Sequence, residues 1–186
     1  MRPIATLLDR SRMLDPTGLP EELKLLYDGG LRFPAPRNQP YVIGNFVSTL
    51  DGVVSFEVPG KSGGGDISGF NEADRFTMGL LRASADAILV GEPTLREVAS
   101  EHLWLAEHIY PEGRQKYARY RQRELNKPGP PLNVIVSGSG AVDLQKAVFR
   151  RPGLRTLIIS RWRYNGSVAN IPKLPREEFD VIKVPC

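Results

Sequence analysis

The sequence has very little cysteine and histidine. Its 186 residues include one cysteine, Cys186, which is the last residue, and two histidines, His102 and His108. A disulfide framework and a cysteine-based zinc cluster are therefore excluded, and so is a histidine-rich metal site. We expect no bound metal.

Long apolar runs are also missing. No stretch approaches the ~20 apolar residues that a helix needs to cross a bilayer, so we expect no membrane partner. Residues 1–14 have no uninterrupted apolar core and carry Asp9, which fits neither a secretory signal nor an acid-poor transit peptide. A soluble cytoplasmic protein is the expectation.

Neither charge sign dominates the chain. Lysine and arginine number 25 against 21 acidic residues, a net charge of +4, which permits anionic small ligands without demanding nucleic acid. One basic stretch, interleaved with Tyr117 and Tyr120, is similar to a nucleic-acid footprint and comprises Arg114, Lys116, Arg119, Arg121, Arg123 and Lys127. Glu112 and Glu124 favour instead a solvated helix with ordinary ion pairs. We expect no nucleic-acid partner.

Length and composition indicate one domain with an extension. Hydrophobic residues make up 41% of the chain, enough for one sizeable core. We expect residues 1–40 to form an N-terminal arm with a short helix near Pro20–Tyr27, and residues 41–186 to form the domain. Prolines at positions 34, 36 and 40 exclude a regular helix before the domain begins.

The domain alternates predicted strands and helices. The apolar and β-branched segments 41–48, 87–91, 132–137, 154–160 and 179–184 are predicted strands. The intervening helices are predicted at 71–85, in pieces over 94–126, and at 143–149. This alternation predicts an α/β fold with a mainly parallel central sheet flanked by helices.

A candidate anion site follows the second predicted strand. Thr94 and Glu97 have the spacing of a capping box at a helix start, where free amides and the positive helix end favour a phosphate. An ordinary helix cap without a ligand is the alternative.

A second candidate follows the third predicted strand. In Ser137–Gly140 the small residues allow backbone amides to approach an anion. The dinucleotide fingerprint G-x-G-x-x-G is absent because position 143 is aspartate, and a plain strand-to-helix turn remains the alternative. Two such turns at the carboxyl ends of one sheet favour an extended cofactor that carries phosphates.

The first predicted strand ends in an Asp-Gly turn. Asp51 and Gly52 are strong turn formers, so we expect a structural role for them. The loop Gly60–Ser68, including Lys61, is interpreted either as a mobile cover for a ligand or as a flexible surface loop. No Ser-His-Asp set, HExxH motif or P-loop lysine is present.

Several of these segments together resemble a known enzyme family. Asn45–Gly52, Ser62–Ser68, Leu81–Gly91 and Thr94–Arg96 are similar to the reductase domain of the bifunctional riboflavin-biosynthesis deaminase-reductase. The resemblance implies a dihydrofolate reductase-like fold, a homodimer, and NADPH-dependent reduction of a pyrimidine ribosylamino phosphate at C1′. A pterin or dihydrofolate-type reductase and a catalytically silent nucleotide-binding paralogue are the alternatives.

The resemblance also implies site residues, without assigning a catalytic one. The implied NADPH-binding residues are Asn45, Val47, Thr49, Gly91, Thr94, Ser137, Ser139, Gly140, Ala141 and Val142. The implied substrate-binding residues are Ser62, Asp66, Ser68 and Arg82.

Two departures separate this chain from the family pattern. The family carries an Asp-Asp-Pro-Arg-like segment where this chain has Glu97–Ser100, and a later Glu-Gly-Gly segment has no counterpart before Cys186. We therefore expect a C-terminally truncated chain that lacks the last strands of its sheet and binds NADPH weakly. The alternative is that a partner chain supplies the missing wall.

Overall fold

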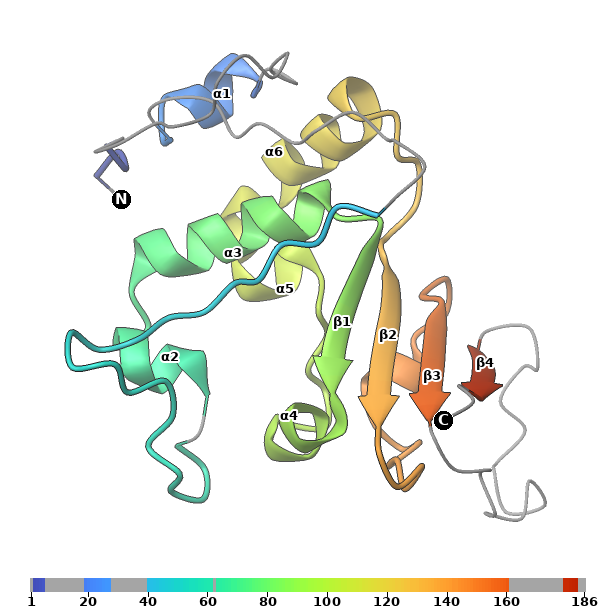
Figure 1. The fold of residues 1–186 in the computed structure, drawn as a ribbon. Coiled ribbons are helices and arrows are strands. Elements are labelled where there is room, and N and C mark those ends of the chain that lie inside the picture. The colour runs from blue at the N-terminus through green and yellow to red at the C-terminus, as the bar shows by residue number, and fades with distance from the viewer. Residues whose placement is uncertain (1, 6–18, 28–39, 62, 161–178, 184–186) are drawn as a thin grey trace.

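A parallel sheet organises the chain. The computed structural model describes residues 2–5, 19–27, 40–61, 63–160 and, for the backbone alone, 179–183. Four parallel strands lie in the order β1-β2-β3-β4 (Figure 1), and their bounds are Ala87–Gly91, Leu132–Ser137, Thr156–Ser160 and Phe179–Lys183. The parallel α/β prediction is confirmed, and four of the five predicted strands are present with bounds within two residues of the prediction.

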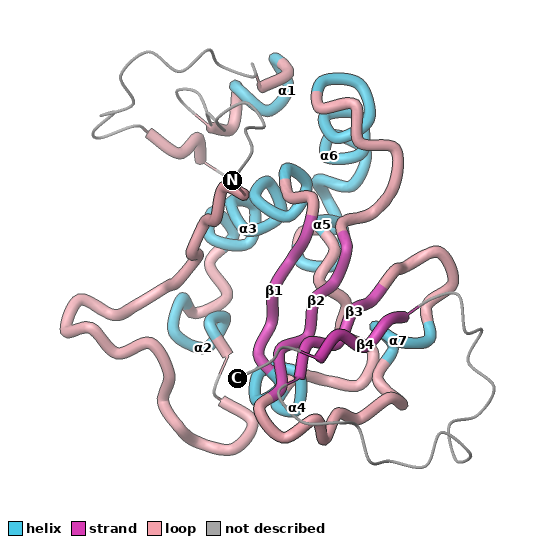
Figure 2. Tube along the Cα trace, turned by 45° about the vertical axis from the view of Figure 1, so that its right-hand side comes forward, coloured by secondary structure: helices cyan, strands magenta, loops and turns pink. Residues whose placement is uncertain are grey.

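Helical segments gather at both ends of β1. Figure 2 shows α3, α5 and α6 near the amino end of β1 and α4 at its carboxyl end. The helical segments are α1 (Glu21–Lys24), α2 (Gly64–Ser68), α3 (Glu72–Ser84), α4 (Glu92–Glu97), α5 (Ala106–Ile109), η1 (Pro111–Gly113), α6 (Arg114–Arg119), the π-helical turn η2 (Tyr120–Glu124) and α7 (Ala147–Arg150). The long helix α3 starts as predicted, because the side chain of Asn71 accepts from the amides of Ala73 and Asp74 at 2.9 and 3.3 Å.

The prediction of a strand over residues 41–48 is wrong. This segment is extended but pairs with no strand among the described residues, and it crosses in front of α3 (Figure 1). Val42 is 81% exposed and Phe46 is 86% exposed. Strand propensity reflects packing on a sheet rather than a backbone preference, so an apolar segment without a pairing edge stays a loop.

Part of the predicted loop Gly60–Ser68 is helical. Residues Gly64–Ser68 form α2, which ends at Gly69 in the left-handed conformation with φ +60°. The predicted Asp-Gly turn is confirmed, since the amide of Gly52 donates to the carbonyl of Thr49 at 3.0 Å and Gly52 has φ +90°.

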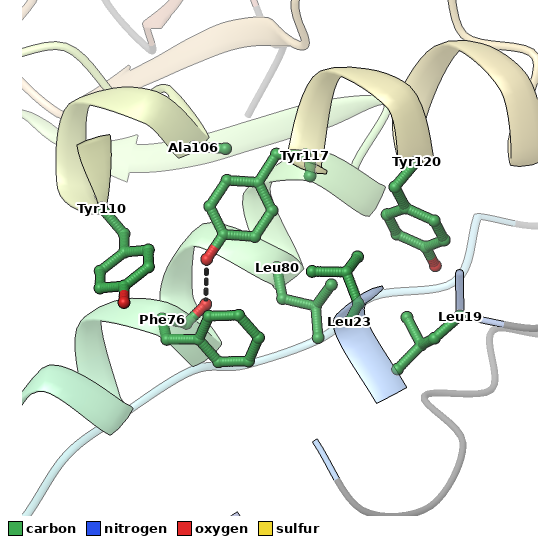
Figure 3. Close-up of a cluster of buried hydrophobic side chains, with 9 residues drawn as sticks. Leu19, Leu23, Phe76, Leu80, Ala106, Tyr110, Tyr117 and Tyr120 are labelled. Carbon is green, nitrogen blue, oxygen red and sulfur yellow. Dashed lines mark hydrogen bonds between the residues drawn. The ribbon is translucent and has the colours of Figure 1, made fainter. Parts of the chain in front are cut away.

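Two hydrophobic clusters fill the described structure. The helical cluster (Figure 3) consists of Leu19, Leu23, Phe76, Leu80, Ala83, Ala106, Tyr110, Tyr117 and Tyr120. The sheet cluster consists of Val90, Leu95, Trp104, Ile135, Leu144, Val148, Phe149, Leu154 and Ile158. Leu19 and Leu23 come from the segment before the domain, and Glu22 there pairs with Arg119 of α6 at 2.6 Å.

No helix in the described part of the chain is long and apolar enough to cross a membrane.

Candidate functional site

The carboxyl ends of β1 and β2 bring the two predicted anion turns together. Gly91 lies opposite Val136 in the register of these strands, so the turn after β1 and the turn after β2 leave the sheet side by side. Because carboxyl ends of parallel strands are where open α/β sheets bind ligands, this edge is the candidate cofactor crevice.

The capping-box prediction for the first turn is wrong. The helix α4 begins at Glu92 with Gly91 as its cap, so Thr94 lies inside the first turn and caps nothing with its side chain. Pro93 explains the earlier start, because proline fits the first turn of a helix and has no N–H to satisfy. Thr94 is exposed and remains at the crevice edge.

The second turn is organised by its own serines. The hydroxyl of Ser137 accepts from the amide of Gly140 at 3.0 Å, and the hydroxyl of Ser139 accepts from the amide of Ala141 at 3.2 Å. Gly140 has φ +73°, which favours glycine. Two amides are therefore used inside the turn, while each serine keeps a hydroxyl proton to donate. The side chain of Val142, just after this turn, is partly buried and packs against the sheet cluster.

The residues around Val47 lie beside α2 rather than in the two turns after β1 and β2. A Cβ placed on Gly64 would come within 3.1 Å of the Val47 Cγ1, so Val47 packs against α2. The Thr49 hydroxyl binds the Asp51 carboxylate, which holds the pKa of that carboxyl below its usual range. Asn45 is exposed. The implied NADPH-binding set is thus divided between the strand ends and the segment beside α2.

The implied substrate residues in α2 bind their own backbone. The carboxylate of Asp66 accepts from the amide of Gly63 at 3.2 Å, and the Ser68 hydroxyl donates to the carbonyl of Gly65 at 3.3 Å. Ser62 lies outside the described residues. Val47 and this implied substrate segment are therefore neighbours through Gly64.

Arg82 occupies a different place, at the end of α3. Its Nη1 donates to the carbonyl of Leu105 at 3.4 Å, and burial lowers its pKa to about 10. Both histidines of the chain lie near it, and the positive charge of Arg82 lowers their pKa values further. Sequence reasoning used these histidines only to exclude a metal site, and no motif linked them to Arg82.

Trp104 is buried in the sheet cluster. Within the described residues, no group of three or more His, Cys, Asp or Glu side chains could hold a metal ion.

The comparison with protein families decides the assignment. Residues 40–169 match the family described as RibD C-terminal domain. The chain belongs to this family. The RibD C-terminal domain is a riboflavin-pathway reductase family of the dihydrofolate reductase-like α/β fold, and the match spans β1, β2, β3 and both strand-end turns. Curated proteins and solved structures gave no match.

The segment that departs from the family pattern anchors α7. The amine of Lys146 donates to the carbonyl of Val98 at 2.7 Å, and the amide of Ala147 donates to the carbonyl of Ser100 at 2.8 Å. In this RibD C-terminal domain the stretch Glu97–Ser100 therefore has a structural use.

Proposed function

We propose that this chain is an NADPH-dependent reductase that acts on a pyrimidine ribosylamino phosphate. The family match over residues 40–169 carries this proposal. The adjacent turns after β1 and β2 support it, because they lie at the sheet edge where phosphate-bearing cofactors bind. The turn after β2 offers the serine hydroxyls, and the turn after β1 offers Gly91 and the hydroxyl of Thr94.

The protein supplies orientation in this reaction. A bound NADPH would supply the hydride for C1′ of the ribosyl group, which opens to a ribityl chain. Ser137 and Ser139 would hold cofactor phosphates with their hydroxyls, and Val47 would provide an apolar surface beside α2.

A charge introduced into the turn after β2 tests this proposal. Ser139 is exposed, so Ser139→Asp leaves the fold intact and places a carboxylate where a cofactor phosphate would bind. We expect the KM for NADPH to rise about tenfold, equivalent to about 1.4 kcal/mol, in an assay of NADPH oxidation with the ribosylamino-pyrimidine substrate.

Gln122→Glu is the matched control. It adds the same charge at an exposed position on η2, away from the strand ends, and should leave the KM for NADPH unchanged. Equal effects of the two substitutions would contradict a cofactor site at this turn.

A catalytically silent nucleotide-binding paralogue is the second candidate. The carbonyl groups of Val98 and Ser100 hold α7, in the stretch where the family has its acidic segment, and this observation favours it. NADPH binding by calorimetry without any turnover would identify the paralogue, whereas turnover with the pyrimidine substrate would eliminate it.

A further inference from the structure

Lys146 is a buried lysine between the turn after β2 and α7. It is only 7% exposed and forms the N-cap of α7. Its amine donates to the carbonyl of Val98 at 2.7 Å and to the carbonyl of Arg96 at 3.4 Å. It makes no ion pair with a carboxylate in the part of the chain that the structure describes. The partners of this buried ammonium group are therefore backbone carbonyls.

These carbonyls lie at the carboxyl end of α4. Arg96 is in the last turn of the helix, and Val98 is its C-cap. The last carbonyls of a helix have no partner inside it, and a cation there also complements the helix dipole. The amide of Ala147 adds a second tie, because it donates to the carbonyl of Ser100 at 2.8 Å. Two donors that follow β2 thus hold the segment that follows β1.

The segment that they hold begins at the candidate cofactor crevice. Gly91 is paired with Val136 at the strand ends, so strand pairing fixes the start of α4. The helix has 6 residues and is therefore about 9 Å long. Because it is so short, the position of its carboxyl end sets the direction of the whole helix, including Thr94 in its first turn. Lys146 therefore controls where Thr94 lies relative to Ser137–Val142.

Apolar packing alone would cover α4. Leu95 is 1% exposed in the sheet cluster, and Val98 packs against that cluster. Burial of an ammonium group is costly unless its donors are used, so a lysine is an expensive way to fill this space. Apolar contacts are non-directional, whereas hydrogen bonds fix distance and angle. What the amine adds to the packing is a defined orientation of the helix.

We propose that Lys146 is a positioning residue, which together with the amide of Ala147 fixes α4 in the orientation that lets Gly91–Thr94 and the turn after β2 bind one cofactor. It acts through α4 and needs no contact with the cofactor. The assignment of the cofactor rests on the proposed function, whereas the coupling of the two turns through Lys146 does not.

Lys146→Met tests the coupling without any ligand. Methionine preserves the apolar packing of the side chain but has neither charge nor donor. In amide NMR spectra of the ligand-free chain, we expect the signals of Gly91, Glu92 and Thr94 to move. The amide of Val98, which donates to the carbonyl of Thr94 at 3.2 Å, should exchange about tenfold faster. Unchanged signals and exchange in the folded variant would overturn the proposal.

Two controls separate positioning from loss of charge and from loss of packing. Arg150→Met removes the same charge from an exposed position of α7 and should leave the signals of Gly91–Thr94 in place. Val148 is fully buried in the sheet cluster, so Val148→Ala should lower stability without removing a donor, and should leave NADPH affinity unchanged. Equal effects of Val148→Ala and Lys146→Met on these signals and on NADPH affinity would refute the positioning role.

Ala147→Pro keeps the test decisive if Lys146→Met does not fold. Ala147 is the first residue of α7, where proline is well accommodated. Lys146 before it has φ −61° and ψ 142°, the extended conformation that a following proline favours. The substitution removes the amide that donates to Ser100, and we expect the signals of Gly91–Thr94 to move. Unchanged signals in this variant would refute the coupling of the two segments.

The effect on the cofactor is measured separately. Calorimetry should show that NADPH binds the Lys146→Met variant about tenfold more weakly than the parent chain. The KM for NADPH should rise while kcat at saturating NADPH stays the same, because Lys146 does not touch the reacting atoms. Parent-like NADPH affinity in the folded variant would overturn the positioning role. Failure of the parent chain to bind NADPH would contradict the proposed function instead, and the ligand-free amide signals would still decide the coupling.

Discussion

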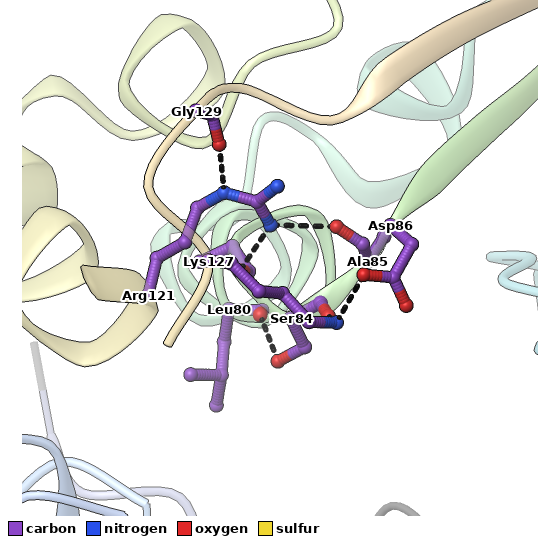
Figure 4. A network of polar contacts seen from close by, with 8 residues as sticks. Leu80, Ser84, Ala85, Asp86, Arg121, Lys127 and Gly129 are labelled. Carbon is purple, nitrogen blue, oxygen red and sulfur yellow. Dashed lines mark hydrogen bonds and ion pairs between the residues drawn. The ribbon is translucent and has the colours of Figure 1, made fainter. Parts of the chain in front are cut away.

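Two basic side chains, Arg121 and Lys127, cap the carboxyl end of α3. Arg121 donates to the carbonyls of Ala83 and Ala85 at 3.0 and 2.6 Å, and Lys127 donates to that of Ser84 at 2.6 Å (Figure 4). Lys127 also pairs with Asp86 at 2.8 Å. The last carbonyls of a helix lack internal partners, and cations there also complement the helix dipole. The predicted solvated basic face is therefore wrong for these two residues.

Arg121→Met should lower the free energy of unfolding by about 1–3 kcal/mol, because it leaves helix-end carbonyls without their charged donors. Urea denaturation measures this loss. Arg123→Met is the control, since Arg123 is exposed in the same η2 turn and should change stability by less than about 0.5 kcal/mol. Equal losses would show that the helix-end contacts contribute nothing.

His102 makes stability depend on pH. Its folded pKa of about 4 lies below the ordinary 6.5, so the unfolded chain binds the proton more strongly. Stability from the neutral ring is complete above pH 6.5 and is lost as the pH falls toward 4. Partial solvent access limits the loss to about 1–2 kcal/mol.

Urea unfolding at pH 7.5 and pH 5 in chloride buffer measures this dependence. Between these pH values the His102 ring of the unfolded chain becomes protonated, whereas the folded ring, with a pKa of about 4, stays mostly neutral. His102→Phe cannot titrate and should lose less stability over the interval than the parent chain. An equal loss in both proteins would assign the pH dependence to other groups.

The packing of α3 on α6 depends on a glycine. A Cβ at Gly79 would lie 2.7 Å from the hydroxyl oxygen of Tyr117 and 2.8 Å from its ring, too close for either group. Tyr117 is held there by its hydrogen bond of 2.8 Å to the carbonyl of Phe76 (Figure 3). The glycine therefore sets how closely the two helices approach.

Gly79→Ala should destabilise the protein by about 1–3 kcal/mol, although alanine is normally the better helix residue by about 1 kcal/mol. Thermal or urea unfolding would measure this. In a Tyr117→Leu background the same substitution should be neutral or stabilising, since the phenol is gone. The same cost in both backgrounds would exclude the clash as its cause.

Sequence periodicity predicted some elements better than others. The helix α3 has a clear apolar stripe and a capping Asn71, and β1 and β2 are short apolar runs, so local patterns were enough. The segment 41–48 has the composition of a strand, but pairing depends on a neighbouring edge that composition does not report. The start of α4 follows Pro93 in the first turn rather than the Thr94–Glu97 spacing.

The site was predictable only where it follows strand ends. Parallel pairing brings the residues after β1 and β2 together, and the alternation of strands and helices predicts that pairing. The grouping of Arg82, His102 and His108 depends on how α5 packs against α3. No sequence spacing encodes such a contact between distant segments.

At the scale of the whole molecule, the two hydrophobic clusters occupy different parts of the fold. The helices α3, α5 and α6, which carry most of the helical cluster, lie near the amino end of β1 (Figure 2), and the sheet cluster covers one face of β1, β2 and β3 through Val90, Ile135 and Ile158. The carboxyl ends of β1 and β2, which carry the two turns, are held in place by strand pairing. The segment with Val47 is held instead by the turn at Thr49–Gly52 and by its contact with α2.

The central claim is that NADPH binds over the carboxyl ends of β1 and β2. Backbone amide NMR of the labelled chain during NADPH titration tests it directly, even when binding is weak. The account predicts the largest shifts at the amides of Gly91, Glu92, Thr94 and Ser137–Val142, with α6 unaffected. Shifts confined to the helical cluster, or none at a saturating NADPH concentration, would contradict it.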